Sequence, residues 1–197
     1  MKKSNLGLLI GGGLVLVIIL WCVSTYNGII EMEEPTTTAW ANVQSQYQRR
    51  ADLIPNLVST VKGYAKHEQE TLEGVINARA RATQITVDPN NLTPEKLQEF
   101  QAAQGELSQA LGRLMMVQEQ YPDLKASEQF KDLQAQLEGT ENRINKARDD
   151  FNKVVEEYNL KVRRFPGNIL AGMFGFQTKA KFEADANAQS APSVSFD

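Results

Sequence analysis

The stretch SEQFKDLQAQLEGTENRINKARDDFNKVVEEYNLKVRRF (Ser127–Phe165) repeats apolar residues at steps of three and four along its whole length. The repeated positions are Phe130, Leu133, Leu137, Thr140, Ile144, Ala147, Phe151, Val154, Tyr158, Val162 and Phe165. The rhythm persists for about five heptads, which is typical of a long helix packed against other helices. At ~1.5 Å per residue this helix is roughly 50 Å long, far longer than an ordinary globular helix. Ser127 is in place to cap its start.

Two further segments carry the same kind of stripe. The first is predicted as one long helix whose stripe comprises Trp40, Val43, Tyr47, Ala51, Ile54, Val58, Val61, Ala65, Leu72, Val75 and Ala82. The second comprises Leu97, Phe100, Gln104, Leu107, Leu111, Leu114, Gln118 and Tyr121. Threonines beside Pro35 are expected to start the first helix, and Thr93 followed by Pro94 to start the second. The loop TQITVDPNNLTPEK (Thr83–Lys96) separates them.

Three long amphipathic stripes must bury one another, because none is stable facing water. The sequence therefore predicts an all-α fold: an elongated antiparallel bundle of three long helices over residues 31–182. After a turn at Pro166 and Gly167, FPGNILAGMFGF (Phe165–Phe176) is expected to add a short C-terminal helix. Residues 183–197 are predicted to be a mobile tail, with only PSVSF (192–196) resembling a strand.

Residues 1–30 are predicted to be an N-terminal membrane anchor that spans the bilayer at about residues 6–26. No charged residue occurs from Ser4 to Ile30, and about 20 apolar residues suffice to cross a ~30 Å hydrocarbon core. A cleaved secretory signal is the alternative, but the apolar run is long for one and no small-x-small site follows. Cys22 follows Trp21, whereas a lipoprotein signal needs a small residue there.

Charge gives an expected orientation and excludes one class of partner. Lys2 and Lys3 precede the span and acidic residues follow it, so the positive-inside rule places the bundle on the extracytoplasmic face of a bacterial inner membrane. Of 21 basic residues only those two precede the span; all 24 acidic residues follow it, which leaves a net charge of about −5. With no basic block, nucleic acid is not an expected partner.

Pro55 interrupts the first stripe without changing its phase. A proline inside a helix removes one hydrogen bond and crowds the carbonyl four residues earlier, that of Ala51, at a cost of ~3 kcal/mol. Because Ile54 and Val58 keep the rhythm, we expect a continuous helix with a bend at Pro55. A moving hinge is the alternative reading.

The sequence offers little catalytic chemistry. His67 is the only histidine and Cys22, in the span, the only cysteine, so a histidine- or cysteine-based metal site or a thiolate nucleophile is not expected. No G-x-S-x-G elbow occurs. We predict a non-enzyme with no cofactor and no metal; a hydrolase would require Asp52, His67 and other polar groups to converge around the Pro55 bend.

One segment has more apolar residues than a surface turn explains. Its candidate docking patch consists of Phe165, Ile169, Leu170, Met173, Phe174 and Phe176. These residues either cap the open end of the bundle or dock onto a protein or a membrane. The sequence leaves both readings open.

YPDLKASEQFKDLQAQLEGTENRINKARDDFNKVVEEYN (Tyr121–Asn159), FPGNILAGMFGF and the closing PSVSF resemble the LemA family of bacterial membrane-anchored proteins. The resemblance covers about Trp40 to Phe196. It implies a single N-terminal span followed by a long-helix bundle, and it carries no catalytic residues over to this sequence. Some family members are described with the helical domain on the cytoplasmic side, so the resemblance and the charge rule give opposite orientations.

The functional expectation is a single-pass, membrane-anchored helical scaffold or adaptor that acts through protein contacts or self-assembly. Heptad stripes on long helices can also pair between chains, so a homo-oligomer is one form of this expectation. The alternatives are a lipid-contacting or membrane-remodelling protein and, less in keeping with the residues, the hydrolase. The identity of a protein partner is not encoded in any motif.

Overall fold

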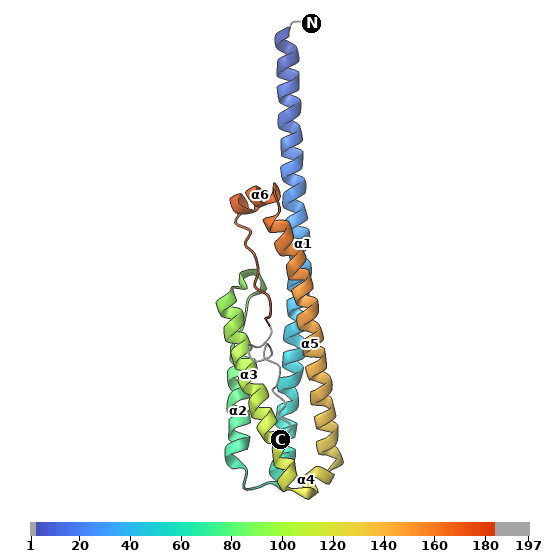
Figure 1. Ribbon diagram of the computed structural model, residues 1–197, viewed down its shortest axis with the longest axis vertical. Helices are drawn as coiled ribbons and strands as arrows, with labels where there is room; N and C mark the ends of the chain where they lie inside the picture. Colours follow the sequence, from blue (N-terminus) through green and yellow to red (C-terminus); the bar gives the residue numbers. More distant parts are fainter. Residues whose placement is uncertain (1–2, 184–197) are drawn as a thin grey trace, which may run out of the picture.

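The computed structural model describes residues 3–183 and shows only helices and their connections there. The elements are α1 (Lys3–Tyr64), α2 (Gln69–Gln84), η1 (Pro89–Asn91), α3 (Pro94–Met116), η2 (Val117–Gln120), α4 (Pro122–Ala126), α5 (Glu128–Arg163) and α6 (Gly167–Phe174). Helices α1, α2, α3 and α5 run alternately up and down in a long rod, and the N-terminal part of α1 projects beyond it (Figure 1). The predicted all-α bundle is confirmed. The predicted tail, apart from Glu183, lies outside the described residues.

The predicted first helix is wrong at both ends. It does not begin near Pro35, because α1 runs without interruption from the apolar N-terminal segment into the bundle. The hydroxyls of Thr36 and Thr37 donate backward to the carbonyl of Glu33 (2.6 and 3.5 Å), as threonines inside a helix do, and do not cap a start. The physical reason is that the buried stripe already includes Ile29 and Thr36, so packing favours a helix through Pro35.

The expected single helix from Trp40 to Ala82 is also divided. Helix α1 ends at Tyr64, and after residues 65–68 the chain folds back as α2. In the described part of the chain the bundle therefore has four helices, α1, α2, α3 and α5, of which α2 is the shortest. If α1 continued straight beyond Tyr64, Leu72 and Val75 would lie beyond the first residues of α5 and would be exposed to water. Folded back, both side chains are buried in one cluster with Ile54 and Leu57.

Pro55 lies inside α1, which is a continuous helix there as predicted. Since proline has no N–H, the carbonyl of Ala51 lacks its helical donor. Arg79 of α2 supplies the missing donor: its Nε–H donates to the Ala51 carbonyl at 2.8 Å. The proline therefore creates an acceptor that ties α2 to α1. The bend itself remains a prediction.

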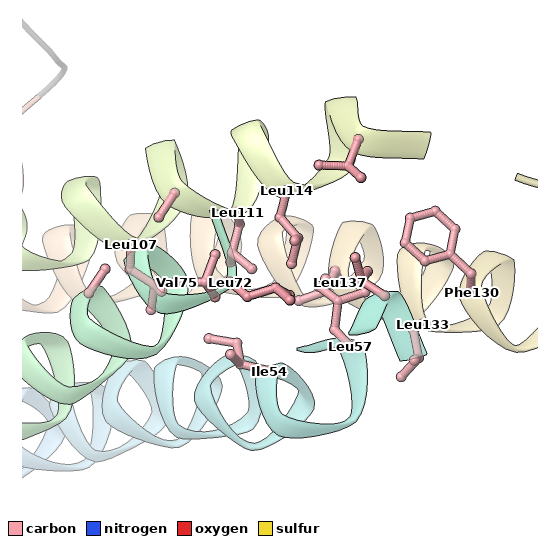
Figure 2. Packing of buried hydrophobic residues seen from close by; sticks show 14 of the residues in the cluster. Ile54, Leu57, Leu72, Val75, Leu107, Leu111, Leu114, Phe130, Leu133 and Leu137 are labelled. Atoms are coloured by element: carbon pink, nitrogen blue, oxygen red, sulfur yellow. The ribbon is translucent and has the colours of Figure 1, made fainter. Parts of the chain in front are cut away.

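Among residues 3–183, the buried apolar side chains form three clusters along the rod. In the cluster farthest from the N-terminus, side chains from α1, α2, α3 and α5 meet, among them Ile54, Leu72, Leu111 and Leu137 (Figure 2). The middle cluster is aromatic: the Trp40 ring lies 5.4 Å from those of Phe100 and Phe151, and the Trp40 indole N–H donates to the Val87 carbonyl at 3.1 Å. The third cluster, around Ile29, closes the end from which α1 projects.

Both predicted caps after the first helix are confirmed. The Thr93 hydroxyl accepts from the N–H of Lys96 at 3.3 Å, and the Ser127 hydroxyl accepts from the N–H of Phe130 at 3.4 Å. The predicted stripe of α5 holds except near its end. Val155, rather than Val154, is fully buried, and Phe165 lies beyond the helix with its side chain 79% exposed.

Candidate functional site

The candidate site is the end of the rod where α1 leaves the bundle. Among the described residues, one helix is long and apolar enough to cross a membrane, and this apolar part of α1 makes few contacts with the rest of the protein. Large apolar side chains from Ile10 to Val23 are exposed, whereas Ile29 is fully buried. The anchor and the bundle thus meet between Val23 and Ile29.

Helix α6 lies against α1 at this junction (Figure 1). The ring of Tyr26 is 5.0 Å from that of Phe174, in an edge-to-face arrangement, and 5.6 Å from that of Phe176. Gly167, at the start of α6, lies close to Thr25 of α1: a Cβ atom added to this glycine would be 3.6 Å from the Thr25 methyl carbon. These contacts fix the level of α6 along α1.

One part of the predicted docking patch caps the bundle. Leu170 is buried, and its neighbour Ala171 belongs to the cluster formed by Ile29, Tyr158 and Val162, against which Phe176 also packs. The chain turns back at Gly175, whose φ of +79° suits glycine, and the N–H of Phe176 donates to the carbonyl of Ala171 at 2.9 Å. These residues pack onto the end of the bundle, as the capping interpretation expects.

The other part is largely exposed, although Phe174 also contacts Tyr26 of α1. We call Phe165, Ile169, Met173 and Phe174 the apolar collar; their exposed fractions range from 53% to 79%. Four large exposed apolar side chains within ten residues exceed the scattered apolar residues of an ordinary protein surface. The sequence indicated no division of the six-residue patch into cap and collar, because that division depends on which side of α6 meets α1.

Basic side chains stand next to the collar. Lys161, Arg163 and Arg164 are exposed in the last turn of α5 and the residue that follows it. The Lys161 side chain lies directly against α1 at the junction, because a Cβ atom added to Gly28 would be only 3.0 Å from the Lys161 Nζ. Exposed Glu31 and Glu34 lie on α1 just beyond, on the bundle side.

Residues 175–183, which we call the strap, return from α6 along the bundle. Asn159 of α5 accepts from the N–H of Lys179 (2.8 Å) and donates to its carbonyl (2.9 Å). Asn152 holds the N–H and carbonyl of Phe182 in the same way (2.8 and 2.9 Å). Asn152 and Asn159 are seven residues apart on α5, a rise of ~10.5 Å. Lys179 and Phe182 are three residues apart in the strap, and three extended residues span ~10 Å, so each asparagine lies beside its strap residue. Sequence reasoning missed the strap.

Two side chains fasten the strap to the rest of the core. The ring of Phe182 stacks on that of Trp40 at 5.9 Å. The buried Lys179 Nζ pairs with the Glu33 carboxylate (3.0 Å), donates to the Pro89 carbonyl (2.9 Å), and lies 5.2 Å from the centre of the Tyr158 ring. Burial, with a smaller contribution from Glu33, raises the pKa of Tyr158 to about 12.

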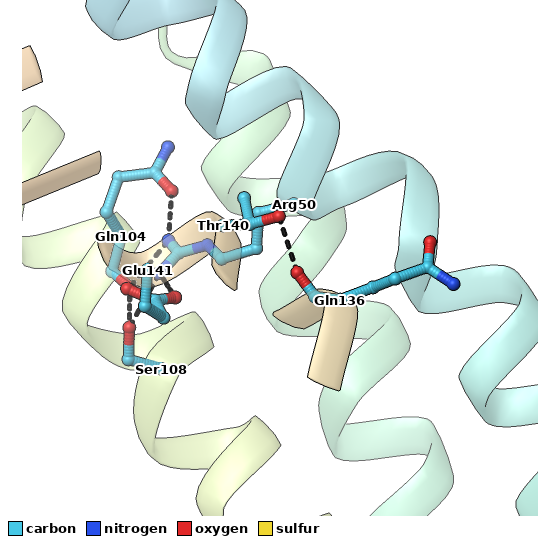
Figure 3. Close-up of polar contacts among 6 residues, drawn as sticks. All are labelled: Arg50, Gln104, Ser108, Gln136, Thr140 and Glu141. Atoms are coloured by element: carbon cyan, nitrogen blue, oxygen red, sulfur yellow. Dashed lines mark hydrogen bonds and ion pairs between the residues drawn. The ribbon is translucent and has the colours of Figure 1, made fainter. Parts of the chain in front are cut away.

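A buried arginine joins three helices in the middle of the rod. Arg50 of α1 is 1% exposed, and its guanidinium donates to the side chains of Gln104 (2.6 Å) and Ser108 (2.8 Å) on α3 and to Glu141 (2.7 Å) on α5 (Figure 3). Glu141 is partly exposed and balances the charge. Sequence reasoning missed this residue, although Arg50 follows Tyr47 by three positions and so lies in register with the stripe.

The residues that a hydrolase would need do not converge. Asp52 is exposed on α1 and accepts from Gln48 at 2.7 Å, while His67 is exposed in the connection to α2, some 15 residues further along. A pocket lined by Tyr47, Gln104 and neighbouring residues contains neither Asp52 nor His67. Within residues 3–183, no group of three metal-ligating side chains is present.

The described part of the chain is therefore a helical bundle continuous with a candidate membrane span, as in a membrane-associated protein. The chain belongs to the LemA family, whose model matches residues 39–196. The predicted family is confirmed.

Named relatives support the same assignment. Magnetosome protein MamQ 2 of Paramagnetospirillum magneticum is 27% identical over 186 residues, which cover 86% of this chain and 68% of the relative. Magnetosome protein MamQ of Magnetospirillum gryphiswaldense is 27% identical over 169 residues, covering 77% of this chain and 62% of the relative. Protein LemA of Metamycoplasma hominis is 25% identical over 162 residues, covering 82% and 70%.

Proposed function

We propose that this protein is a non-enzymatic scaffold or adaptor that holds a helical rod at a fixed position on a membrane and binds proteins along it. The observation that carries the proposal is the continuity of α1, in which the anchor and one wall of the bundle are a single helix of 62 residues. A helix of that length extends about 90 Å at ~1.5 Å per residue. The rod is therefore rigidly oriented relative to its anchor, as a scaffold requires.

Several observations support binding over catalysis. Asp52 and His67 stay apart and exposed, and the names of the relatives denote no reaction. Outside the anchor and the collar the rod is covered mainly by polar and charged side chains, which suit reversible protein contacts or association between copies. We propose that the rod lies on the extracytoplasmic side of the inner membrane, which Lys2 and Lys3 favour by the positive-inside rule.

The proposal is tested by crosslinking the full-length protein in intact cells. A photoreactive amino acid is introduced at one exposed position on each bundle helix: Ser45 on α1, Asn77 on α2, Gln109 on α3 and Lys153 on α5. A scaffold yields a discrete crosslinked product from one or two faces, which mass spectrometry identifies as another protein or a second copy of this chain.

The matched control is the anchor alone, residues 1–34, fused to an unrelated helical domain that carries the same photoreactive residue. Products shared with this control reflect mere proximity at the membrane. If all four positions give only those shared products, the scaffold proposal is wrong.

Contact with lipid is a second candidate function, and the exposed apolar collar favours it. This candidate does not compete with the scaffold, because the collar occupies one end of the rod and the four crosslinking positions lie elsewhere.

A further inference from the structure

The level of the bilayer surface along α1 follows from charge and burial. From Ile10 to Val23 the helix is apolar and exposed to its surroundings, and Glu31 is the first acidic residue of α1. A carboxylate is costly inside hydrocarbon, and tryptophan and tyrosine favour the boundary region. The surface therefore crosses α1 between Trp21 and Glu31, a stretch of about 15 Å at ~1.5 Å per residue.

Helix α6 contacts α1 within this stretch. The ring contact between Phe174 and Tyr26 and the approach of Gly167 to Thr25 both lie there. The collar is thus beside the point at which α1 enters the bilayer, and its apolar surface continues the apolar surface of the anchor through Tyr26.

The exposed side of α6 has the composition of an interfacial helix. Ile169 and Met173 are four residues apart and so lie on one face, opposite the buried side of the helix, with Phe165 preceding them. Lys161, Arg163 and Arg164 stand at the same corner. Apolar side chains beside lysine and arginine are typical of helices that lie in the headgroup region and attract anionic lipids.

We propose that α6 is a second membrane element of this protein, lying in the lipid interface. The collar enters the boundary between headgroups and acyl chains, and the basic corner faces anionic headgroups. The proposal rests on the same placement of α1 in a bilayer as the proposed scaffold, but not on any protein partner. It gives the rod two contacts with the membrane, which restrict its tilt.

The test uses the full-length chain with Cys22, the only cysteine, replaced by alanine. Met173→Cys carries an environment-sensitive fluorophore, and the protein is reconstituted into vesicles of phosphatidylcholine and phosphatidylglycerol. Met116→Cys is the matched control, because Met116 is 69% exposed, close to the 73% of Met173. Met116 is the last residue of α3, and its neighbours Met115 and Val117 pack in the core cluster farthest from α6. We expect a blue-shifted emission at position 173, quenched by lipids bearing a nitroxide near the headgroup, and neither effect at position 116.

Equal, water-like emission at both positions would overturn the proposal. A blue shift at position 173 without quenching by the labelled lipids would also overturn it, because a second copy of the chain would then cover the collar. Neither result bears on crosslinking along the rod, so a failure of this proposal is distinguishable from a failure of the scaffold proposal.

The basic corner is tested in the same system. The double variant Arg163→Gln, Arg164→Gln leaves the collar unchanged and should reduce quenching at position 173 in vesicles with phosphatidylglycerol more than in vesicles of phosphatidylcholine alone. If quenching is equal in both lipid mixtures, before and after the substitutions, the basic corner does not bind anionic headgroups and that part of the proposal is wrong.

Discussion

Arg50 places a permanent charge in the core of the rod, where it joins α1 to α3 and α5. Its guanidinium is planar and carries five N–H donors, so one side chain reaches Gln104, Ser108 and Glu141 together. Burying a charge is costly unless partners surround it. The sequence places Arg50 in register with apolar residues, and the structure shows that its guanidinium contacts polar partners on two other helices.

We expect Arg50→Met to lower the free energy of unfolding by about 2–4 kcal/mol, because it leaves the polar groups of Gln104 and Ser108 without their donor. Arg50→Lys should lower the free energy of unfolding by about half as much, since an ammonium keeps the charge but cannot donate to all three partners in the planar geometry of a guanidinium. Urea unfolding followed by circular dichroism measures both losses.

The control for these variants is Arg49→Met, because Arg49 is the adjacent arginine on the exposed face of α1. It should change stability by no more than about 0.5 kcal/mol. Equal losses from Arg49→Met and Arg50→Met would show that the polar contacts of Arg50 do not stabilise the rod.

Pro55 and Arg79 form a pair that joins two helices. The proline removes the helical donor to Ala51, and the arginine replaces it from α2 at 2.8 Å. The sequence predicted an uninterrupted helix through Pro55 but not this compensation, because nothing local indicates which distant side chain meets a freed carbonyl.

A double-mutant cycle tests this pairing. Arg79→Met should cost about 1–2 kcal/mol in the natural sequence and clearly less in the Pro55→Ala background, where the new N–H of residue 55 satisfies the Ala51 carbonyl. Arg81→Met, two residues further along α2 and exposed, should cost the same in both backgrounds. An Arg79→Met cost that is independent of residue 55 would contradict the pairing.

The strap depends on two asparagines of α5. Asn152 and Asn159 each hold one strap residue by its N–H and its carbonyl, as a neighbouring β-strand would. Their spacing of one heptad was visible in the sequence. The interpretation was not available from the sequence alone, because an asparagine at heptad spacing on a helix is equally consistent with an exposed polar face.

We expect Asn152→Ala and Asn159→Ala to release the strap. Lys179 is buried in the natural protein, so trypsin should cleave after it slowly, and each substitution should accelerate this cleavage. Loss of the Phe182 ring from Trp40 should change the tryptophan emission at the same time. Asn142→Ala, at an exposed position of the same helix, is the control. Unchanged cleavage in both strap variants would show that the side-chain pairs are dispensable.

For the whole chain, periodicity predicted the helical rod, and residue types predicted the capped starts at Thr93 and Ser127. The apolar content of residues 165–176 predicted one undivided patch. The sequence-based prediction failed where one local pattern is compatible with two different structures. A stripe at steps of three and four looks the same on a straight helix and on one folded back at residues 65–68, which contain neither proline nor glycine. A proline beside threonines looks like a helix start, yet packing of Ile29 and Thr36 carries α1 through Pro35.

The continuity of α1 through Pro35 leads to a prediction about depth in the membrane. The chain has two tryptophans, Trp21 in the anchor and Trp40 in the core, separated along one helix by about 28 Å at ~1.5 Å per residue. Each can be observed alone in a Trp40→Phe or Trp21→Phe variant. In vesicles containing brominated lipids, we expect the emission of Trp21 to be strongly quenched and that of Trp40 to be unaffected.

The physical reason is that Trp21 lies among exposed apolar side chains near the bilayer surface, whereas Trp40 is fully buried between α1, α3, α5 and the strap. Lipids brominated near the headgroup should quench Trp21 more than lipids brominated at the end of the chain, because tryptophan favours the boundary region. Comparable quenching of both tryptophans would mean that the rod lies flat on the membrane. In that case a continuous α1 could not cross the bilayer and hold the bundle away from it, and both the scaffold geometry and the level assigned to the collar would be wrong.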